Sequence, residues 1–353
     1  MTTDIPLALT FSDVLLKPQR SSVVSRSQVS LKTHLTPKIE INFPVISINM
    51  DCVTGVPLSI AMAKFGGISF YPRFATPPVQ AREVKQILDA GYQVIPAVGI
   101  KSGELARVDL LVSIGIKAIT IDIAHGHLES CLDFVTILKK KYPNLEIISG
   151  VVGTYEGARD LFLAGADAVR VGVGPGSICT TRLMTGSGMP QITAIMDAFK
   201  AGEEFGKPIL ADGGIKNSGD IVKALAAGAS AVVVGSLLAG ANESASELVE
   251  INGKKYKTFN ASTSKTEKLK QYSKNSADKS LSYVDYVEGL EAFVESEGPL
   301  ESILNRLDKG IRSGLSYSGA FNIEELHQKA QFVRVTPISY AENSNRGVTL
   351  FSS

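Results

Sequence analysis

The chain has 353 residues with 36 basic and 35 acidic side chains, and this near-neutral charge gives no reason to expect a nucleic acid or a membrane as partner. No apolar run reaches the roughly 18 residues of a membrane span, and residues 1–9 lack a signal-peptide pattern. Its three cysteines, Cys52, Cys131 and Cys179, are too far apart for a disulfide framework or a zinc site, so we expect a cytoplasmic protein.

Short apolar runs alternate with amphipathic segments along most of the chain, a pattern typical of parallel βαβ units. We expect helices over Glu129–Lys141, Thr154–Ala164 and Ser218–Ala227. We expect strands at Pro44–Asn49, Gly67–Phe70, Gln93–Val98, Ala118–Asp122, Glu146–Val151, Ala168–Val171, Pro208–Ala211 and Ala231–Val234. Eight such units predict an α/β fold of the (β/α)8 TIM-barrel type, which typically needs about 250 residues. The similar segments AGADAVRVG (164–172) and AGASAVVVG (227–235) favour this barrel over an open doubly wound sheet.

Two stretches interrupt the alternation. Residues Gly253–Leu290 are rich in lysine, serine and asparagine and follow the eighth strand, so they are interpreted as a long flap at the catalytic face, or alternatively as a surface loop. The tail from Pro337 onward is polar and without periodicity. We therefore predict a single domain over residues 1–353, with the flap at about 253–290.

The loop GVGPGSICTTR (172–182) after the sixth strand is the richest candidate for chemistry. Its glycines let the backbone approach a ligand closely, and Ser177 adds a hydroxyl for a phosphate. Carbonyl groups of such a turn can also hold a monovalent cation. Cys179 lies in this loop beside Arg182, where a thiol can ionise and attack an electrophilic carbon. Cys52 and Cys131 are interpreted as small buried residues.

The loops after the seventh and eighth strands are the usual phosphate site of a TIM barrel. Here they read ADGGI (211–215) and VGSL (234–237). Backbone donors would come from Gly213, Gly214, Gly235 and Ser236, and Asp212 would accept from ribose hydroxyls. Asp122, in IDIAHGH (121–127), is a further ribose candidate. His125 and His127 are expected to pack or hydrogen-bond rather than to bind a metal.

These motifs together resemble the IMP dehydrogenase / GMP reductase family over nearly the whole chain. Besides the loops already quoted, LTFSDVLLKPQRSSVVSRSQV (9–29), NMDCVT (49–54), GSGMPQITAI (186–195) and QFVRVT (331–336) carry the resemblance. It implies that Cys179 attacks C2 of a purine nucleoside monophosphate. The regulatory module of the CBS type that many of the dehydrogenases carry is absent, because Arg73 leads directly into the next helix.

The resemblance leaves the branch of the family to be decided. Residues 253–290 contain no Arg-Tyr pair of the kind that activates water in the dehydrogenases; the nearest tyrosine is Tyr272. Glu288 and Thr181 stand where reductases keep a proton-transfer pair. We therefore expect NADPH-dependent reductive deamination of GMP, or of a relative such as dGMP, to IMP. The alternatives are an IMP dehydrogenase that uses NAD, since QITAI and AENSNRGV look more like bacterial dehydrogenases, and an inactive nucleotide-binding paralogue.

The resemblance also implies further site residues, although two segments depart from the family pattern. Asn260-Ala261-Ser262 replaces a Gly-Met pair that contacts the purine, and Val151 replaces an asparagine, so the base pocket is expected to differ. The family implies a homotetramer and possible K⁺ binding at Gly174, Gly176, Cys179 and Arg182. Substrate contacts would also involve Met50 and Gly289. Cofactor contacts would involve Ser25, Arg26, Arg73, Asp122, Ile123, Ala124, Ser313 and Ser316, with Arg73 favouring a 2′-phosphate.

Overall fold

Eight parallel strands form a closed barrel in the computed structural model, which describes residues 5–274 and 288–340. In their order around the barrel, the strands are β4 (Val45–Ser47), β5 (Ile68–Tyr71), β6 (Ile95–Val98), β7 (Ala118–Ile121), β8 (Glu146–Val152), β9 (Ala168–Val171), β10 (Ile209–Asp212) and β11 (Ala231–Val234). The barrel closes where Val232 of β11 pairs with Val45 of β4. The predicted TIM barrel is therefore confirmed, and the open sheet is excluded.

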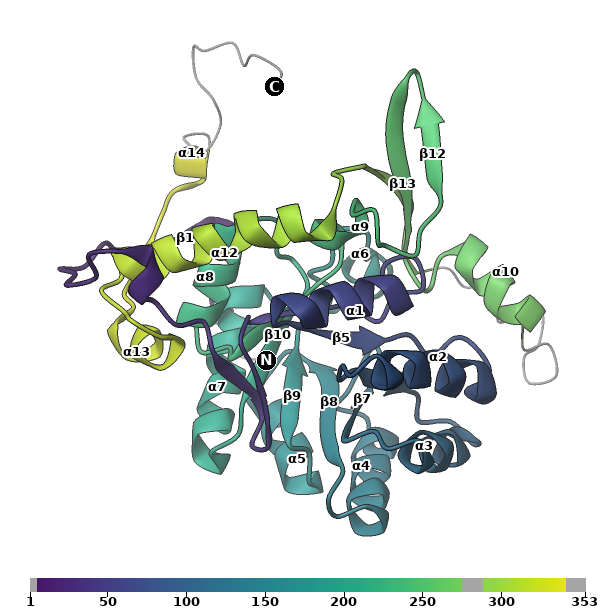
Figure 1. Cartoon of the computed structure of the whole chain (residues 1–353). Helices are drawn as coiled ribbons and strands as arrows, with labels where there is room; N and C mark the ends of the chain where they lie inside the picture. The colour runs from purple at the N-terminus through teal and green to yellow at the C-terminus, as the bar shows by residue number, and fades with distance from the viewer. Residues whose placement is uncertain (1–4, 275–287, 341–353) are drawn as a thin grey trace.

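Helices surround this barrel, as Figure 1 shows. The main ones are α1 (Val56–Phe65), α2 (Pro77–Asp89), α3 (Glu104–Ser113), α4 (Glu129–Lys141), α5 (Tyr155–Ala164), α7 (Gln191–Phe205), α8 (Ser218–Ala226) and α12 (Leu300–Tyr317). Each of the three predicted helices is present. Thr154 and Asn217 are the N-cap residues of α5 and α8. Their side chains accept a hydrogen bond from a backbone N–H of the first turn, which stabilises the start of each helix.

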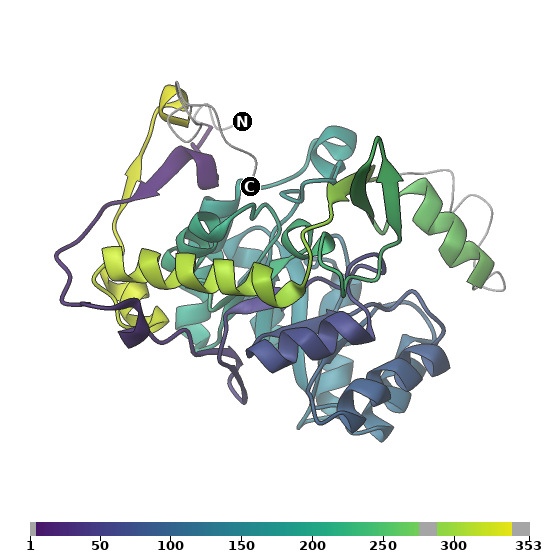
Figure 2. The ribbon, with the colours of Figure 1, turned by 45° about the horizontal axis from the view of Figure 1, so that its top comes forward.

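In the described part of the chain, the remaining strands form three small sheets outside the barrel. The remaining elements are η1 (Phe11–Asp13), β1 (Val14–Leu16), η2 (Arg26–Gln28), β2 (Thr33–Thr36), β3 (Ile39–Ile41), α6 (Thr181–Thr185), α9 (Ser236–Ala239), β12 (Leu248–Ile251), β13 (Lys254–Asn260), α10 (Lys265–Lys274), β14 (Glu291–Glu295), α13 (Ile323–Lys329), β15 (Phe332–Arg334) and α14 (Pro337–Tyr340). The three sheets are β2–β3, β12–β13–β14 and β1–β15. In Figure 2, purple β1 lies beside yellow β15, its antiparallel partner.

The β2–β3 hairpin closes one end of the barrel. Leu35 and Ile41 of this hairpin belong to the same buried cluster as Ile46, Phe70 and Leu210, whose side chains fill the barrel interior. A larger cluster lies between the strands and the surrounding helices. Because the hairpin packs at the end where the strands start, the other end carries the loops that follow the strands.

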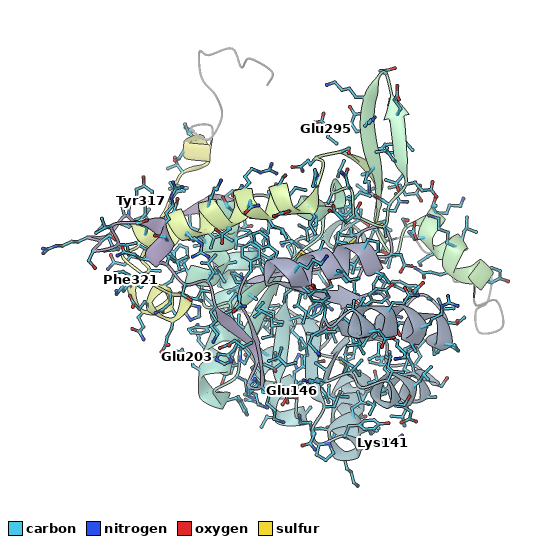
Figure 3. The ribbon with its side chains drawn as sticks, viewed as in Figure 1. Lys141, Glu146, Glu203, Glu295, Tyr317 and Phe321 are labelled. Carbon is cyan, nitrogen blue, oxygen red and sulfur yellow. The ribbon has the colours of Figure 1, made fainter. Side chains whose placement is uncertain are left out.

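The segment predicted as a flap, 253–290, contains β13, the central strand of an antiparallel sheet in the order β12–β13–β14, whose outer strands flank the segment on both sides. Figure 3 shows Glu295, the last residue of β14, at the opposite side of the molecule from Glu146, which begins β8. The sheet therefore stands at the catalytic end of the barrel. It starts at Leu248, five residues before the predicted boundary, because β12 supplies the pairing edge for β13. Residues 275–287 lie outside the described residues, and movement of the segment stays a prediction.

Cys52 and Cys131 are buried, with exposed fractions of 7% and 0%, as predicted, whereas Cys179 is exposed. Among the described residues, no helix is both long and apolar enough to cross a membrane.

Candidate functional site

The loop between β9 and α6 carries Cys179 at the catalytic end of the barrel. At its start, a side chain on Gly172 would place its Cβ 1.9 Å from the carbonyl oxygen of Asp212, so only glycine fits there. Gly174 has φ +77°, a left-handed conformation that glycine adopts without strain. The Cys179 N–H then donates to the Gly176 carbonyl oxygen at 3.1 Å, which folds the loop into a turn with the thiol at the surface.

Cys179 has two polar neighbours that were predicted to work with it. Its Sγ lies 3.1 Å from Oγ1 of Thr181, and the Thr181 hydroxyl donates to Oε1 of Glu288. The Leu290 N–H also donates to the Ile178 carbonyl oxygen at 2.9 Å, which attaches the end of the flap segment to the cysteine loop. A carboxylate, a hydroxyl and a thiol thus form a chain along which a proton can move. The structure brings the three predicted catalytic residues together; their roles stay predictions.

The first of the two predicted phosphate loops, 211–215, lies beside the cysteine loop. A Cβ on Gly213 would be 3.2 Å from Cγ of Pro175 and 3.4 Å from the Gly176 nitrogen, so these loops are in close contact. Gly213 and Gly214 have φ angles of +85° and +79°, which expose their backbone groups at the turn. Ser177, also predicted for the phosphate, is exposed in the neighbouring turn.

The second phosphate segment begins at Gly235, which precedes α9, and Ser236 is the first residue of that short helix. A Cβ on Gly235 would lie 3.6 Å from the Phe259 ring and 3.7 Å from Sδ of Met50. The predicted phosphate segment therefore adjoins Met50, the predicted substrate contact after β4, and the flap strand β13.

Arg170 occupies the centre of the site, and sequence reasoning missed it. Its Nε and Nη2 donate to Oδ2 of Asp212 at 2.8 and 2.6 Å, and Nη2 also donates to Asn49 at 3.1 Å. Nη1 donates to Thr120 at 3.2 Å, and the guanidinium lies over the Phe70 ring. A signal did exist: in the two similar segments, arginine stands where the other has Val233.

Burial and Arg170 act in opposite directions on the Asp212 carboxyl. Burial raises its pKa, Arg170 opposes this, and the pKa stays above its ordinary value. Asp122, whose Oδ1 lies 4.0 Å from Nη1 of Arg170, behaves differently. Burial raises its pKa too, but Arg73 and Arg170 together outweigh burial and lower the pKa below the ordinary value. Asp122 is therefore held as an anion, suited to accept hydrogen bonds from sugar hydroxyls.

The predicted cofactor residues fall into two groups. In the first group, Nε of Arg73 donates to Oδ2 of Asp122 at 2.9 Å. Ile123 follows, and its carbonyl accepts from the Val151 N–H at 3.1 Å. Ala124 comes next and is exposed. An Arg73 engaged with a carboxylate is already partly neutralised, which weakens the prediction that it recognises a 2′-phosphate.

The second group lies on the other side of the barrel. Nη1 of Arg26 in η2 is 3.4 Å from Oγ of Ser313 in α12. Ser25 precedes η2 and accepts from the Ser27 N–H, and Ser316 follows in α12. In Figure 1, the end of α12 that carries this group is far from α2 and α4, the helices that follow the strands of the first group, β5 and β7. One chain does not bring the two groups together.

The predicted base-contacting turn, 260–262, is folded against the flap end. Asn260 is buried, and its amide donates to Oε1 of Glu267 at 3.3 Å. The Ala261 N–H donates to the Leu290 carbonyl at 3.0 Å, and the Ser262 carbonyl accepts from Gln271 at 2.8 Å. Gly289 is required here, since its Cβ would lie 2.3 Å from that of Ala261. The Asn260 amide thus faces α10, and contact of this turn with a purine stays a prediction.

The residues predicted for a monovalent cation surround a tightly packed turn. Gly174 and Gly188 lie against the Arg182 side chain, and Nη2 of Arg182 donates to the Met189 carbonyl at 2.8 Å. The Gly176 carbonyl oxygen accepts one hydrogen bond, and its second lone pair is available to coordinate an ion. Binding of K⁺ at this turn stays a prediction. Elsewhere in the described part of the chain, no cluster of three His, Cys, Asp or Glu residues is placed to hold a metal, and His127 hydrogen-bonds to Asp160 at 2.9 Å.

Comparison with known proteins agrees with this geometry. The family model described as "IMP dehydrogenase / GMP reductase domain" matches residues 8–346. The chain is 34% identical to the inosine-5′-monophosphate dehydrogenase of Nitrosopumilus maritimus, with 97% of this chain and 98% of the relative covered. It is 37% identical to the enzyme of that name from Borreliella burgdorferi (95% and 96% covered) and 34% identical to that of Escherichia coli K12 (97% and 96%). The chain therefore belongs to the IMP dehydrogenase / GMP reductase family of oxidoreductases.

Proposed function

We propose that this protein is a nicotinamide-dependent oxidoreductase that acts at C2 of a purine nucleoside monophosphate, with the thiolate of Cys179 as nucleophile. One observation carries the proposal: the exposed Sγ of Cys179 lies 3.1 Å from Thr181, which in turn donates to Glu288, on a loop packed against Gly213. The turns at Gly213 and Gly235 would bind the phosphate. The thiol would then reach the base, because both the phosphate and the base lie at the same barrel mouth.

We favour oxidation of IMP with NAD, the alternative in the sequence analysis, over the reductase reading. Relatives that align over nearly their whole length with this chain are named inosine-5′-monophosphate dehydrogenase. In this reaction, the sulfur adds to C2 and hydride leaves C2 for NAD⁺. Water then adds to C2 and expels the thiolate, giving XMP. The Thr181–Glu288 pair would take the proton of that water, a role that suits a carboxylate hydrogen-bonded to a hydroxyl beside the thiol.

Reduction of GMP with NADPH is the second candidate. The sequence from 253 to 290 contains no arginine, so the base used by dehydrogenases is missing. In the reductive direction, the same Thr181–Glu288 pair would give its proton to ammonia as it leaves C2. Hydride from NADPH would then replace the sulfur at C2 to give IMP. The geometry at Cys179 serves either direction.

Asp212 and Asp122 would bind the two sugars. Both donors of Arg170 approach Oδ2 of Asp212, and we propose that Oδ1 accepts from the nucleotide ribose. Asp122, kept ionised by Arg73, would accept from the ribose beside the nicotinamide. The second cofactor group, Arg26 with Ser313, is remote from Asp122 in one chain. This separation supports a site shared between neighbouring subunits, in keeping with the homotetramer that the family resemblance implies.

A substrate panel tests the proposal and separates its two forms. IMP, GMP and dGMP are each mixed with NAD⁺ or NADPH, with and without K⁺. Absorbance at 340 nm follows the cofactor, and chromatography identifies the purine. XMP formed from IMP with NAD⁺ would establish the dehydrogenase, and IMP with ammonia from GMP the reductase. Tight nucleotide binding without turnover in any mixture would instead support an inactive paralogue.

A further inference from the structure

Lys257 on β13 has a buried ammonium group at the base of the flap segment. The residue is only 5% exposed. Its Nζ donates to the carbonyl oxygens of Asn242 and Ser244 and to Oγ of Ser244, each at 3.0 Å. An ammonium group has three N–H donors, so these three oxygens satisfy it completely. If the ammonium moved, it would lose these hydrogen bonds in a place that water does not reach, and this would cost free energy. The contact is therefore expected to be rigid.

The oxygens that Lys257 contacts belong to a segment fixed to the predicted phosphate helix. The Ser244 hydroxyl donates to the carbonyl of Ala239, the last residue of α9, at 2.8 Å. The Ala245 N–H donates to the Val53 carbonyl at 3.1 Å, in the loop that also contains Met50. The ammonium thus attaches β13 to the segment that begins at Gly235.

From Lys257 a continuous set of backbone pairs leads to the cysteine. Lys257 is opposite Val294 in the β13–β14 ladder, and the ladder continues to the pair Asn260 and Glu291. Just before β14, Leu290 donates to Ile178, and Glu288 accepts from Thr181. The position of the Glu288 carboxylate therefore depends on where β13 is held. Lys257 is one of the contacts that hold it, together with buried Phe259, which lies beside Gly235, and the Cys52 thiol, which donates to the Asn260 carbonyl at 3.3 Å.

We propose that Lys257 is a positioning residue, which sets Glu288 against Cys179 by tying the flap sheet to the phosphate-binding segment. This inference rests on the proposed function for its catalytic consequence. A displacement of about 1 Å in a positioned group can lower a rate about 100-fold. Loss of the ammonium should thus slow turnover. Phosphate binding should largely persist, because the Gly213 turn lies against the cysteine loop and the Ser244 hydroxyl still binds the end of α9 at Ala239.

The test compares Lys257→Met with Lys255→Met, a control that removes an exposed lysine from the same strand. We expect Lys257→Met to lower kcat by about 10- to 100-fold while KM for the nucleotide changes less than about threefold. Lys255→Met should match the wild type in both constants. Ser244→Ala removes one acceptor of Lys257 and the bond from that hydroxyl to Ala239, but it leaves both carbonyl acceptors. It should lower kcat by about fivefold, and it serves as the test if Lys257→Met fails to fold.

Amide hydrogen exchange gives a readout that needs no substrate. In Lys257→Met, and less strongly in Ser244→Ala, exchange should become faster at 256–260 and 288–295 but stay unchanged in α4. Equal exchange and equal kcat in the Lys257 and Lys255 variants would overturn the inference, as would equal values in Ser244→Ala and the wild type. If the wild type turns over no purine nucleotide, the proposed function fails, and exchange alone then decides whether Lys257 holds the sheet.

Discussion

Replacement of Arg170 by methionine tests the charge arrangement at the barrel mouth. The Arg170 side chain is 4% exposed and contributes two hydrogen bonds to Asp212, one to Asn49 and one to Thr120. Methionine keeps a similar length but removes every donor. The Asp212 carboxylate would then be a buried anion that has lost its cation.

Removal of one partner from a buried ion pair costs about 3–5 kcal/mol, because the other charge stays desolvated. Asp212 can reduce this cost by taking up a proton. Burial already raises its pKa above the ordinary value, and without Arg170 that rise is no longer opposed. A carboxyl group whose pKa is raised by folding favours the folded state at low pH and disfavours it as the pH rises through the raised pKa. The deficit of Arg170→Met should therefore be largest at neutral and alkaline pH and smaller in acid.

The assay is urea unfolding followed by circular dichroism at about pH 5 and about pH 8. Both values lie above the ordinary Asp pKa of about 3.9, so Asp122 stays ionised at each and its contribution to stability is not lost. We expect Arg170→Met to lose about 3–5 kcal/mol at the higher pH and clearly less at the lower pH. The double variant Arg170→Met/Asp212→Asn should be more stable than Arg170→Met at pH 8, since it has no unpaired charge. A pH-independent loss, or a double variant that is less stable than the single one, would refute the reasoning.

Three further outcomes follow from the site. Cys179→Ala should abolish turnover while calorimetry shows the nucleotide Kd within about threefold of wild type, since phosphate contacts dominate ground-state binding; a Kd weakened as much as turnover would contradict this. Gly172→Ala should lower the free energy of unfolding by more than about 4 kcal/mol, because its methyl would lie 1.9 Å from the Asp212 carbonyl, whereas Gly186→Ala, with φ +71° and open space around it, should cost only about 1–3 kcal/mol; equal losses in urea unfolding would argue against the packing described. Asp122→Asn should raise KM for the nicotinamide cofactor about tenfold and leave the nucleotide Kd nearly unchanged, and the reverse pattern would place Asp122 at the nucleotide instead.

The barrel was predictable because its strands are buried and its helices amphipathic, so local patterns carry the information. Glu129–Lys141 was predicted with the bounds that α4 has, since apolar side chains recur there at helical spacing. The sheet β12–β14 was not predicted. β12 and β14 are short and largely exposed, and β13 begins with lysine-rich sequence. β13 also pairs with β14 across a long intervening segment that no local pattern connects.

The site was predictable in part. Cys179 and the glycine turns at 213 and 235 follow from the loops after barrel strands. Glu288 was placed beside Thr181 only through the family resemblance, because 107 positions separate the two and no spacing rule connects them. Arg170 was predicted only as part of a buried strand, because its neighbours Ala168, Val169 and Val171 are apolar and one charged residue does not change a strand prediction. Residues 260–262 were expected near the base only through the same resemblance, and the hydrogen bond from Asn260 to Glu267 depends on α10, which composition does not reveal.

The β2–β3 hairpin closes the end of the barrel where the strands start, with Leu35 and Ile41 packed in the cluster of interior side chains. Substrate and product must therefore enter and leave at the other end, where Glu288 and Leu290 are hydrogen-bonded to the cysteine loop. A product still bound at this end would therefore block the next substrate, so release must precede the next binding step.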